Sequence, residues 1–367
     1  MGNEKHNNII AIVKGLAIML VVIGHTAYTD EYTHFGSFVY LFHVPLFFVV
    51  SGYCFKKKYL DDKSSFLLKR IKGLYLPFIK WQILFLLVHN TFFTLNIYSV
   101  TTDDVLYNWQ DVFNNLQRII CFDTTEKLAG TLWFLPVLFF ASLFSFIVIW
   151  IISCIKNQKR RPVSLNNKLL VGLILFFIAL SIIRFKTRNF GLSFFSYQTL
   201  LASALFVTGC LIKLNKLRLS KIKKQSRFIT VSLIFLILCL IAIIHPVNMS
   251  KLASWYDILI FYTTTVLGCI LLFNFCHLIN RTPLKSVFVY VGTHTLEILI
   301  WHCLMFKIIS YAKIQYYGLD FKSLAQVPII TEHNNLVWVI LYFIAGMSPL
   351  LFCYAREKLF QYSPNTI

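Results

Sequence analysis

The sequence predicts an all-α protein that crosses a membrane about ten times, and three observations support this fold class. Of the 367 residues, 57% are hydrophobic and only 14% are charged, which is too apolar for a soluble domain. Apolar runs of about 18 or more residues recur along the whole chain, as membrane-spanning helices require. The runs do not alternate between polar and apolar residues, so they favour helices over a β-barrel.

The spans are placed between polar breaks in the sequence. No polar stretch is long enough for a second soluble domain, so we expect one transmembrane domain over residues 1–367. The longest outer connection, residues 98–130, is long enough to cover an outer pocket. We expect the spans near residues 9–28, 37–54, 74–97, 131–153, 169–185, 194–212, 228–244, 257–279, 287–309 and 336–355.

The distribution of Lys and Arg predicts the orientation. With the N-terminus inside, 24 basic residues lie in inner segments and nine in outer ones, which places both termini in the cytoplasm. The outer cluster of Arg184, Lys186 and Arg188 departs from this rule. The net charge of +20 is explained by these inner loops and by lipid headgroups, so we expect membrane lipid and no nucleic acid as a partner.

The nine cysteines predict neither a disulfide framework nor a zinc site. They form no CxxC pair, have no regular spacing, and most of them fall inside apolar runs. Such cysteines are typical of small buried side chains. We therefore expect no metal.

The first span contains two ionisable side chains, Lys14 and His25, eleven residues apart. Eleven residues of helix turn through about three full turns and rise about 16 Å, so both side chains lie on one face at different depths. Ionisable groups in a membrane usually face a protein interior or a watery cavity, and they are functional candidates by default. A Lys that snorkels to the headgroups and a structural His are the alternatives.

The second span contributes His43 and Ser51, and a basic inner segment follows it. Pro45 predicts a kink that frees backbone carbonyls. His43 fits either a functional site or a hydrogen bond in the core. Lys69, Arg70 and Lys72 suit a phosphate-rich cytoplasmic ligand, although anionic lipid headgroups explain the same charge.

The ninth span holds His294, Glu297 and His302. His294 and Glu297 are one turn apart, whereas His302 is rotated from Glu297 by about 140°. A carboxylate within the membrane is costly unless it is paired, so we expect Glu297 to meet a cation or a histidine from another helix. A His with a carboxylate partner is a common general base.

Five motifs, in order, resemble the membrane-bound acyltransferase-3 family, which includes bacterial glycan O-acetyltransferases. The spacing of Lys14 and His25 resembles the family's basic-x10-His pattern, and VPLFFVVSGYCF its FFxxSG segment. FLLKRIKGLYLPF resembles its basic stretch ending in Pro, and GTHTLEILIWH its closing helix motif. LWFLPVLF, which contains Trp133, resembles its WFL helix start. The resemblance runs from about residue 7 to residue 355.

The resemblance implies an enzyme of the bacterial cytoplasmic membrane. Such an enzyme transfers an acyl group, usually acetyl, from cytoplasmic acyl-CoA to a sugar hydroxyl on an envelope glycan or its lipid-linked precursor. Family members with a C-terminal SGNH esterase-like domain pass the acyl group on to it. The present chain ends soon after its tenth span, so it is expected to acylate its acceptor directly or to act with a separate protein.

The resemblance also implies roles for individual residues. The essential histidine of the family's first helix corresponds to His25, and the basic position to Lys14, where the family most often has an Arg with bidentate geometry. We expect His25, supported by Glu297 or His302, to deprotonate the acceptor or to take the acyl group transiently. Attack on a thioester needs a base and an oxyanion stabiliser but no metal. Acyl-CoA or acceptor binding is expected from Lys14, His43, Ser51, Lys69, Arg70, Lys72 and Trp133.

Two other classes of function fit the same residues. Intramembrane His, Glu and Lys side chains also serve transporters, so a flippase for polysaccharide or lipid-linked sugar is the main alternative. The second is a sensor or a non-catalytic partner in polysaccharide assembly. Four aromatic residues on the expected outer side fit either sugar stacking or the interfacial belt: Tyr107, Trp109, Trp255 and Tyr256.

Overall fold

The computed structural model describes residues 2–26, 33–102, 104–158, 166–187, 193–215 and 224–361. Within these ranges the regular structure is helical and contains no strand, which confirms the predicted all-α class. Nine helical segments of this part of the chain are long and apolar enough to cross a membrane, and Phe228–Ile244 is a shorter apolar helix. Within the described residues each predicted span lies largely on helix, and the chain is a multi-pass membrane protein.

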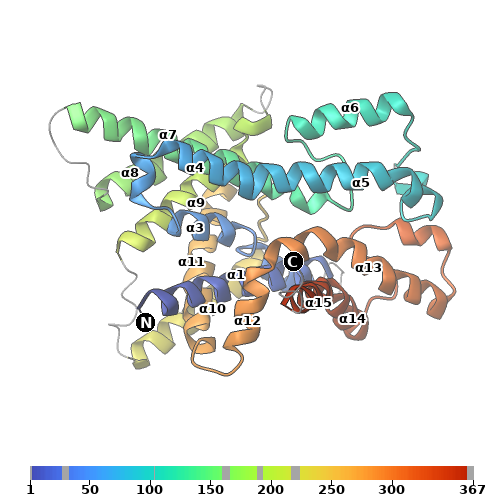
Figure 1. Cartoon of the computed structure of the whole chain (residues 1–367). Helices are drawn as coiled ribbons and strands as arrows, with labels where there is room; N and C mark the ends of the chain where they lie inside the picture. Colours follow the sequence, from blue (N-terminus) through green and yellow to red (C-terminus); the bar gives the residue numbers. More distant parts are fainter. Residues whose placement is uncertain are drawn as a thin grey trace. The chain divides into compact units, whose positions relative to one another are not determined.

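The chain divides into two compact units, which are described separately with the helix labels of Figure 1. Unit 1 comprises Met1–Gly36, Pro77–Trp133 and Ile279–Ile367. Its helices are α1 (Gly2–Thr26), α5 (Leu76–Thr94), η4 (Val100–Thr102), α6 (Trp109–Ile120), η5 (Gly130–Trp133), α12 (Lys285–Thr293), α13 (Thr295–Tyr317), η8 (Phe321–Ala325), α14 (Leu336–Met347) and α15 (Pro349–Gln361).

Helix α1 packs closely against α12 in unit 1, and glycine makes this possible. A Cβ on Gly292 would overlap the carbonyl oxygen of Ala11, and one on Gly15 would lie 2.5 Å from that of Phe288. Small residues at a helix interface let two backbones approach each other in this way. The inner part of α1 is therefore held by backbone contact with α12.

The predicted ninth span, residues 287–309, is interrupted in the structure. Helix α12 ends at Thr293, His294 has a non-helical conformation (φ −112°, ψ 27°), and α13 begins at Thr295. Helix α13 then continues to Tyr317, beyond the predicted end. Two lysines that the sequence assigned to an outer connection, Lys307 and Lys313, are therefore buried in this helix.

The two lysines of α13 remain buried because backbone carbonyls accept hydrogen bonds from their ammonium groups. The Lys307 ammonium donates to the carbonyls of Leu324 and Gln326, at 2.8 and 2.7 Å. Lys313 donates to the carbonyl of Ile330 at 2.9 Å. A lysine paired in this way avoids most of the cost of burying its charge. The segment that follows α13 thus supplies the carbonyl groups that offset the cost of burying the two ammonium groups.

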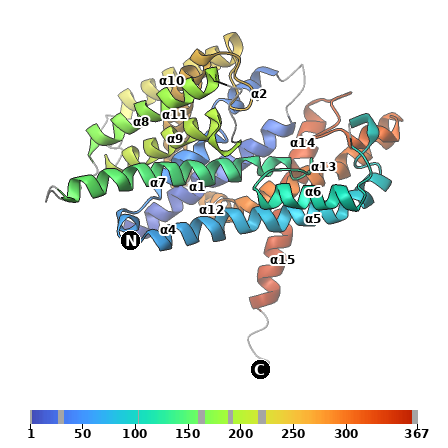
Figure 2. The same ribbon diagram turned by 90° about the horizontal axis from the view of Figure 1, so that it is seen from above.

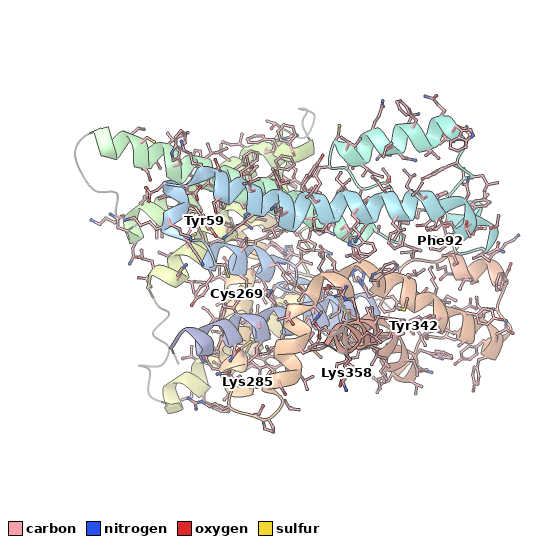
Figure 3. All side chains as sticks on the ribbon, viewed as in Figure 1. Tyr59, Phe92, Cys269, Lys285, Tyr342 and Lys358 are labelled. Carbon is pink, nitrogen blue, oxygen red and sulfur yellow. The ribbon has the colours of Figure 1, made fainter. Side chains whose placement is uncertain are left out.

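The predicted last span also changes direction, at Ser348. Helix α14 ends at Met347, and α15 starts at Pro349 and projects away from the other helices of unit 1 (Figure 2). Pro at the start of a helix is favoured because it has no N–H to satisfy there. Tyr342 of α14 and Lys358 of α15 are labelled in Figure 3.

The connection 98–130, which the charge distribution predicts to lie outside, folds over α5 within unit 1. Its helix α6 runs alongside α5 in both views (Figures 1 and 2). His89 of α5 bonds to Glu126 at 2.9 Å and stacks on Tyr107, with ring centroids 3.5 Å apart. Burial, with the nearby Glu126 and Asp104 carboxylates, raises the pKa of Tyr107 to about 12, so its hydroxyl stays neutral beside them. Asp103 lies outside the described residues.

Unit 2 comprises Ser37–Leu76 and Phe134–Leu278. Helix α9 forms its core, because every residue from 199 to 210 is buried against neighbouring helices. Its helices are α2 (Thr33–Tyr40), α3 (Pro45–Tyr53), η2 (Lys57–Leu60), α4 (Lys63–Arg70), the π-helical turn η3 (Ile71–Tyr75), α7 (Phe134–Gln158), α8 (Asn167–Lys186), η6 (Ser193–Phe195), α9 (Tyr197–Leu214), α10 (Lys224–Ile244) and α11 (Trp255–Ile279).

Two glycines bring α3 and α9 together in unit 2. A Cβ on Gly52 would overlap the carbonyl oxygen of Phe206, and a Cβ on Gly209 would overlap that of Val49. The backbones are therefore in contact, because small residues at a helix interface allow close approach. The kink predicted at Pro45 is also present, since α2 ends at Tyr40 and Pro45 starts α3.

Candidate active site

The first candidate site, in unit 1, is a pair of histidines at the C-terminal end of α1. The His25 ring lies 5.3 Å from the His302 ring of α13, measured between centroids, at an interplanar angle of 46°. Because α1 is continuous from Gly2 to Thr26, His25 stands in its last turn. His25 is half-buried, whereas His302 is fully buried. The structure thus brings together two of the three predicted catalytic residues.

Hydrogen bonding fixes the tautomer of His302. Its Nδ1 lies 2.9 Å from the carbonyl oxygen of Ile298. A carbonyl only accepts, so Nδ1 carries the proton and donates it, and in the neutral ring Nε2 keeps its lone pair. The Cys303 sulfur lies 3.5 Å from this Nε2. His302 is therefore arranged as a hydrogen-bond acceptor beside His25.

Aromatic and small residues of α14 and α13 surround this pair. Phe306 packs edge-on to the His302 ring, with centroids 5.5 Å apart, and to Tyr342 of α14 at 5.7 Å. A Cβ on Gly346 would lie 2.7 Å from both Phe306 and Val22. The glycine lets α14 approach α1 and α13, which holds the two histidine-bearing helices in place.

Asn334 is a polar neighbour that the sequence did not indicate. It is buried, and its amide lies 3.4 Å from the carbonyl oxygen of Thr26, the residue after His25. Its Oδ1 has no hydrogen-bond partner in the part of the chain described. Asn334 belongs to a loop before α14 and to no recognisable sequence motif. Its position near the C-terminal end of α1 is therefore visible only in the structure.

Lys14 lies on the same uninterrupted helix as His25, as the spacing requires. It is half-buried and precedes Gly15, at which α1 contacts α12. Eleven residues of helix separate the two side chains by about 16 Å along the axis. The predicted arrangement of both groups on one face at different depths is therefore retained.

Glu297 has the cationic partner expected from another helix. Its Oε1 lies 4.0 Å from Nη2 of Arg356 in α15, at the limit of an ion pair between partly exposed groups. The neighbouring His294 lies 3.0 Å from Glu357 of the same helix. Glu297 also stands in the first turn of α13, where the helix dipole favours a carboxylate. The Glu297 carboxylate is therefore stabilised by Arg356 of α15 and by the start of its own helix.

The second candidate site, in unit 2, contains Ser51 and Arg70. Nη1 of Arg70 donates to Oγ of Ser51 at 3.0 Å. The guanidinium also lies over two aromatic rings, 4.9 Å from the centroid of Phe66 and 5.8 Å from that of Phe206. Such stacking suits Arg, whose planar group is weakly hydrated. Two of the residues predicted to bind acyl-CoA are thus in contact.

Further cations surround this pair in unit 2. Lys69 donates to the hydroxyl of Tyr59 at 3.0 Å, and Lys72 is exposed in the π-helical turn that follows Arg70. Turns of this type are often found at functional sites. Lys213, at the end of α9, donates to the carbonyl of Phe55. The sequence did not single out Lys213, because it lies far along the chain from the other cations.

The other two predicted binding residues occupy supporting positions. His43 is buried in unit 2, and its Nδ1 donates to the carbonyl of Val39 at 2.8 Å. Trp133 ends η5 in unit 1, where the neighbouring Thr131 donates to the carbonyl of Leu299 in α13 at 3.0 Å. The contacts of His43 match the core hydrogen bond that its sequence context also allowed.

Comparison with known proteins decides the family. A family described as an acyltransferase domain matches residues 7–355, nearly the whole chain. The chain belongs to the membrane-bound acyltransferase-3 family. No curated protein and no solved structure matches it.

Membership of the acyltransferase-3 family gives the chain its general chemistry. The protein is an acyltransferase, so the flippase and the non-catalytic partner no longer describe its main function. An acyltransferase needs a base for its acceptor and a site for its donor. The histidine pair of unit 1 and the cationic group of unit 2 contain the residues predicted for these tasks, and they are our candidates for the base and the donor site.

Proposed function

We propose that this acyltransferase transfers an acetyl group from cytoplasmic acetyl-CoA to a hydroxyl of a cell-envelope polysaccharide or its lipid-linked precursor. The observation that supports the proposal most strongly is the contact between the His25 and His302 rings in a chain of this family. We place the enzyme in a bacterial cytoplasmic membrane, with both termini inside.

The cationic group of unit 2 is our candidate for the donor site. Acetyl-CoA carries several phosphates, and Arg and Lys side chains bind such groups through charge-assisted hydrogen bonds. Arg70 is held by Ser51 and by two aromatic rings, while Lys69 and Lys72 are exposed beside it. Lys14 is the further basic residue that we assign to the donor.

The proposed reaction begins at His25. The imidazole takes the proton of the acceptor hydroxyl, and the hydroxyl oxygen then bonds to the thioester carbonyl carbon. The bond between that carbon and sulfur breaks, and CoA leaves as a thiolate that regains a proton from the imidazolium. A route through acetyl-His25 uses the same groups in two steps.

His302 is our positioning residue for His25. The hydrogen bond to the Ile298 carbonyl fixes its tautomer, so that its Nε2 can accept a hydrogen bond from the neighbouring group. The geometry supports His302 in this role better than Glu297, whose carboxylate faces Arg356. Amide groups stabilise developing oxyanions, and Asn334, which is bonded to Thr26, is our candidate for that donor.

Purified protein tests the proposal. With acetyl-CoA and envelope polysaccharide from the host, the wild type should release CoA thiol and transfer labelled acetyl to the glycan. The His25→Ala variant should lose about 100-fold or more of this activity, the scale of a lost general base. The matched control is His34→Ala, which changes an exposed histidine of α2 and should retain activity. Full activity of His25→Ala would contradict the proposal.

A further inference from the structure

One end of unit 2 carries an exposed group of cations and aromatic rings. This platform consists of Arg184 and Lys186 at the end of α8, His245 and Lys251 between α10 and α11, and Trp255 and Tyr256 at the start of α11. The same α8 cluster is the one that departs from the positive-inside rule, since these helix ends are predicted to face outward. Arg188 of that cluster lies outside the described residues.

Aromatic faces and cations lie together on the platform. Trp255 is 45% exposed and Tyr256 is 47% exposed, and their rings are inclined by 79° with centroids 6.0 Å apart. The Lys186 ammonium lies 5.3 Å from the Trp255 centroid, within the range of a cation–π contact. Lys251 is exposed in the adjoining loop. The surface thus offers two ring faces with positive charge beside them.

A fixed imidazole distinguishes this platform from a simple interfacial belt. Nε2 of His245 lies 2.8 Å from Oδ1 of Asp257, and the His245 side chain is 43% exposed. The other oxygen of Asp257 accepts from the backbone N–H groups of Ala253 and Ser254, both at 2.9 Å. The carboxylate therefore holds the ring in one orientation. Anchoring in lipid headgroups needs no such orientation, whereas recognition of a hydrogen-bonding ligand does.

The charge of the platform is almost unopposed. Unit 2 contains three acidic residues, Asp61, Asp62 and Asp257. The first two follow η2, in the segment predicted to face the cytoplasm. Asp257 is 3% exposed, and its oxygens are taken by His245 and the backbone. A ligand of this platform therefore meets positive charge on its exposed side.

We propose that the platform docks an anionic glycan, a sugar chain that bears carboxylate or phosphate groups. The ring faces of Trp255 and Tyr256 pack against the apolar faces of sugars, while Lys186 and Lys251 bind the anionic groups. The other ring nitrogen of His245, whose Nε2 faces Asp257, accepts a hydrogen bond from a sugar hydroxyl. The inference rests on the proposed function, because it makes the anionic glycan the acceptor class of this acyltransferase.

Binding to the full-length protein in phosphatidylcholine nanodiscs tests the inference without requiring catalysis. The probes are an oligogalacturonate, a ribitol phosphate oligomer and the carboxyl-reduced, neutral form of the first. We expect at least one charged probe to bind about tenfold or more tightly than the neutral one, which would also identify the anionic group. The double variant Lys186→Gln, Trp255→Ala should lose this preference about tenfold, with unchanged thermal unfolding.

The matched control is Lys80→Gln, which changes another lysine over a tryptophan, 4.7 Å from the Trp81 centroid in α5. It should bind the probes as the wild type does. Equal binding of charged and neutral probes, or an unchanged preference in the double variant, would overturn the inference and assign the rings to the interfacial belt. The His25→Ala variant should still bind the charged probe. If the wild type binds it but transfers no acyl group, only the proposed function fails.

Discussion

The two imidazole rings of unit 1 differ in their surroundings, and the difference suggests different tasks. His302 is fully buried and donates Nδ1–H to Ile298, so its orientation and tautomer are fixed. His25 is half-buried at the end of α1, where it can meet a substrate. A fixed ring next to a partly accessible one is the usual relation between a positioning group and a reacting base.

The role of His302 predicts the effect of His302→Asn. The Asn amide can still donate to the Ile298 carbonyl, but it has no counterpart of the Nε2 lone pair. We expect kcat for acyl transfer to fall by about 100-fold, with a nearly unchanged KM for acetyl-CoA. Steady-state kinetics of purified protein measures both values. Cys303→Ala, which changes the adjacent buried thiol, is the control, and wild-type kcat in His302→Asn would exclude the role.

Sequence reasoning found those residues whose chemistry stands out within a single span. Lys14 and His25 are conspicuous because an apolar helix rarely carries two ionisable groups. His89 and Glu126 form a buried pair that the sequence did not predict, since 36 residues lie between them and neither belongs to a motif. Asn334 was missed for the same reason. Contacts between residues that are far apart in the sequence leave no local pattern from which they could be predicted.

At the scale of helices, apolar runs predicted where each element lies but not where it breaks. Pro45 predicted the break between α2 and α3, because Pro has no backbone N–H to donate within a helix. The break at His294 has no such signal, and TLEILIWH continues the apolar run. It follows Gly292, whose backbone touches that of Ala11. The break therefore lies next to a tertiary contact, and hydropathy does not report tertiary contact.

Backbone contact between α3 and α9 predicts a large effect of Gly52→Ala. The added methyl group would overlap the Phe206 carbonyl oxygen, so the helices must separate. Overpacking of this kind costs about 1–3 kcal/mol, and we expect the thermal unfolding midpoint to fall by about 3 °C or more. The control is Gly172→Ala in α8, where a Cβ meets open space. Equal midpoints for the two variants would contradict the packing.

The connection 98–130 should depend on the buried His89–Glu126 pair. His89→Phe keeps a ring to stack on Tyr107 but leaves the Glu126 carboxylate buried without its partner. Loss of one member of a buried pair costs about 3–5 kcal/mol. Hydrogen exchange of this connection should therefore become much faster.

Asp123→Asn provides the comparison for this loop. It breaks the exposed Arg118–Asp123 pair, in which the side chains are 55% and 50% exposed, and exposed pairs contribute about 0–1 kcal/mol. Hydrogen exchange in this variant should stay close to that of the wild type. If His89→Phe and Asp123→Asn showed equally fast hydrogen exchange in this connection, the proposed role of the buried His89–Glu126 pair would be wrong.

For the whole molecule, the sequence predicted the fold class and the family, because both follow from features that extend along the chain. Composition and recurring apolar runs indicate a helical membrane protein, and five motifs in order indicate the acyltransferase-3 family, whose match covers residues 7–355. The division into two compact units was not predicted. It depends on which helices pack together, as α1 packs with α12 and α9 with α3.

The two units contain different parts of the proposed reaction. Unit 1 carries His25, His302 and Lys14, and unit 2 carries the Arg70 cluster and the aromatic platform. Lys14 and the Arg70 cluster are assigned to donor binding, the aromatic platform to acceptor docking, and His25 with His302 to proton transfer. The kinetic effects of single variants are therefore expected to separate into KM for acetyl-CoA, binding of the glycan and kcat.

The central claim is that His25 drives acetylation of an envelope glycan, and mass spectrometry of the host's surface polysaccharide tests it most directly. Cells that carry the wild-type protein should show O-acetylated glycan. Cells with His25→Ala at the same protein level in the membrane should lose these acetyl groups, while cells with His34→Ala should keep them. Unchanged acetylation in the His25→Ala cells would contradict the account.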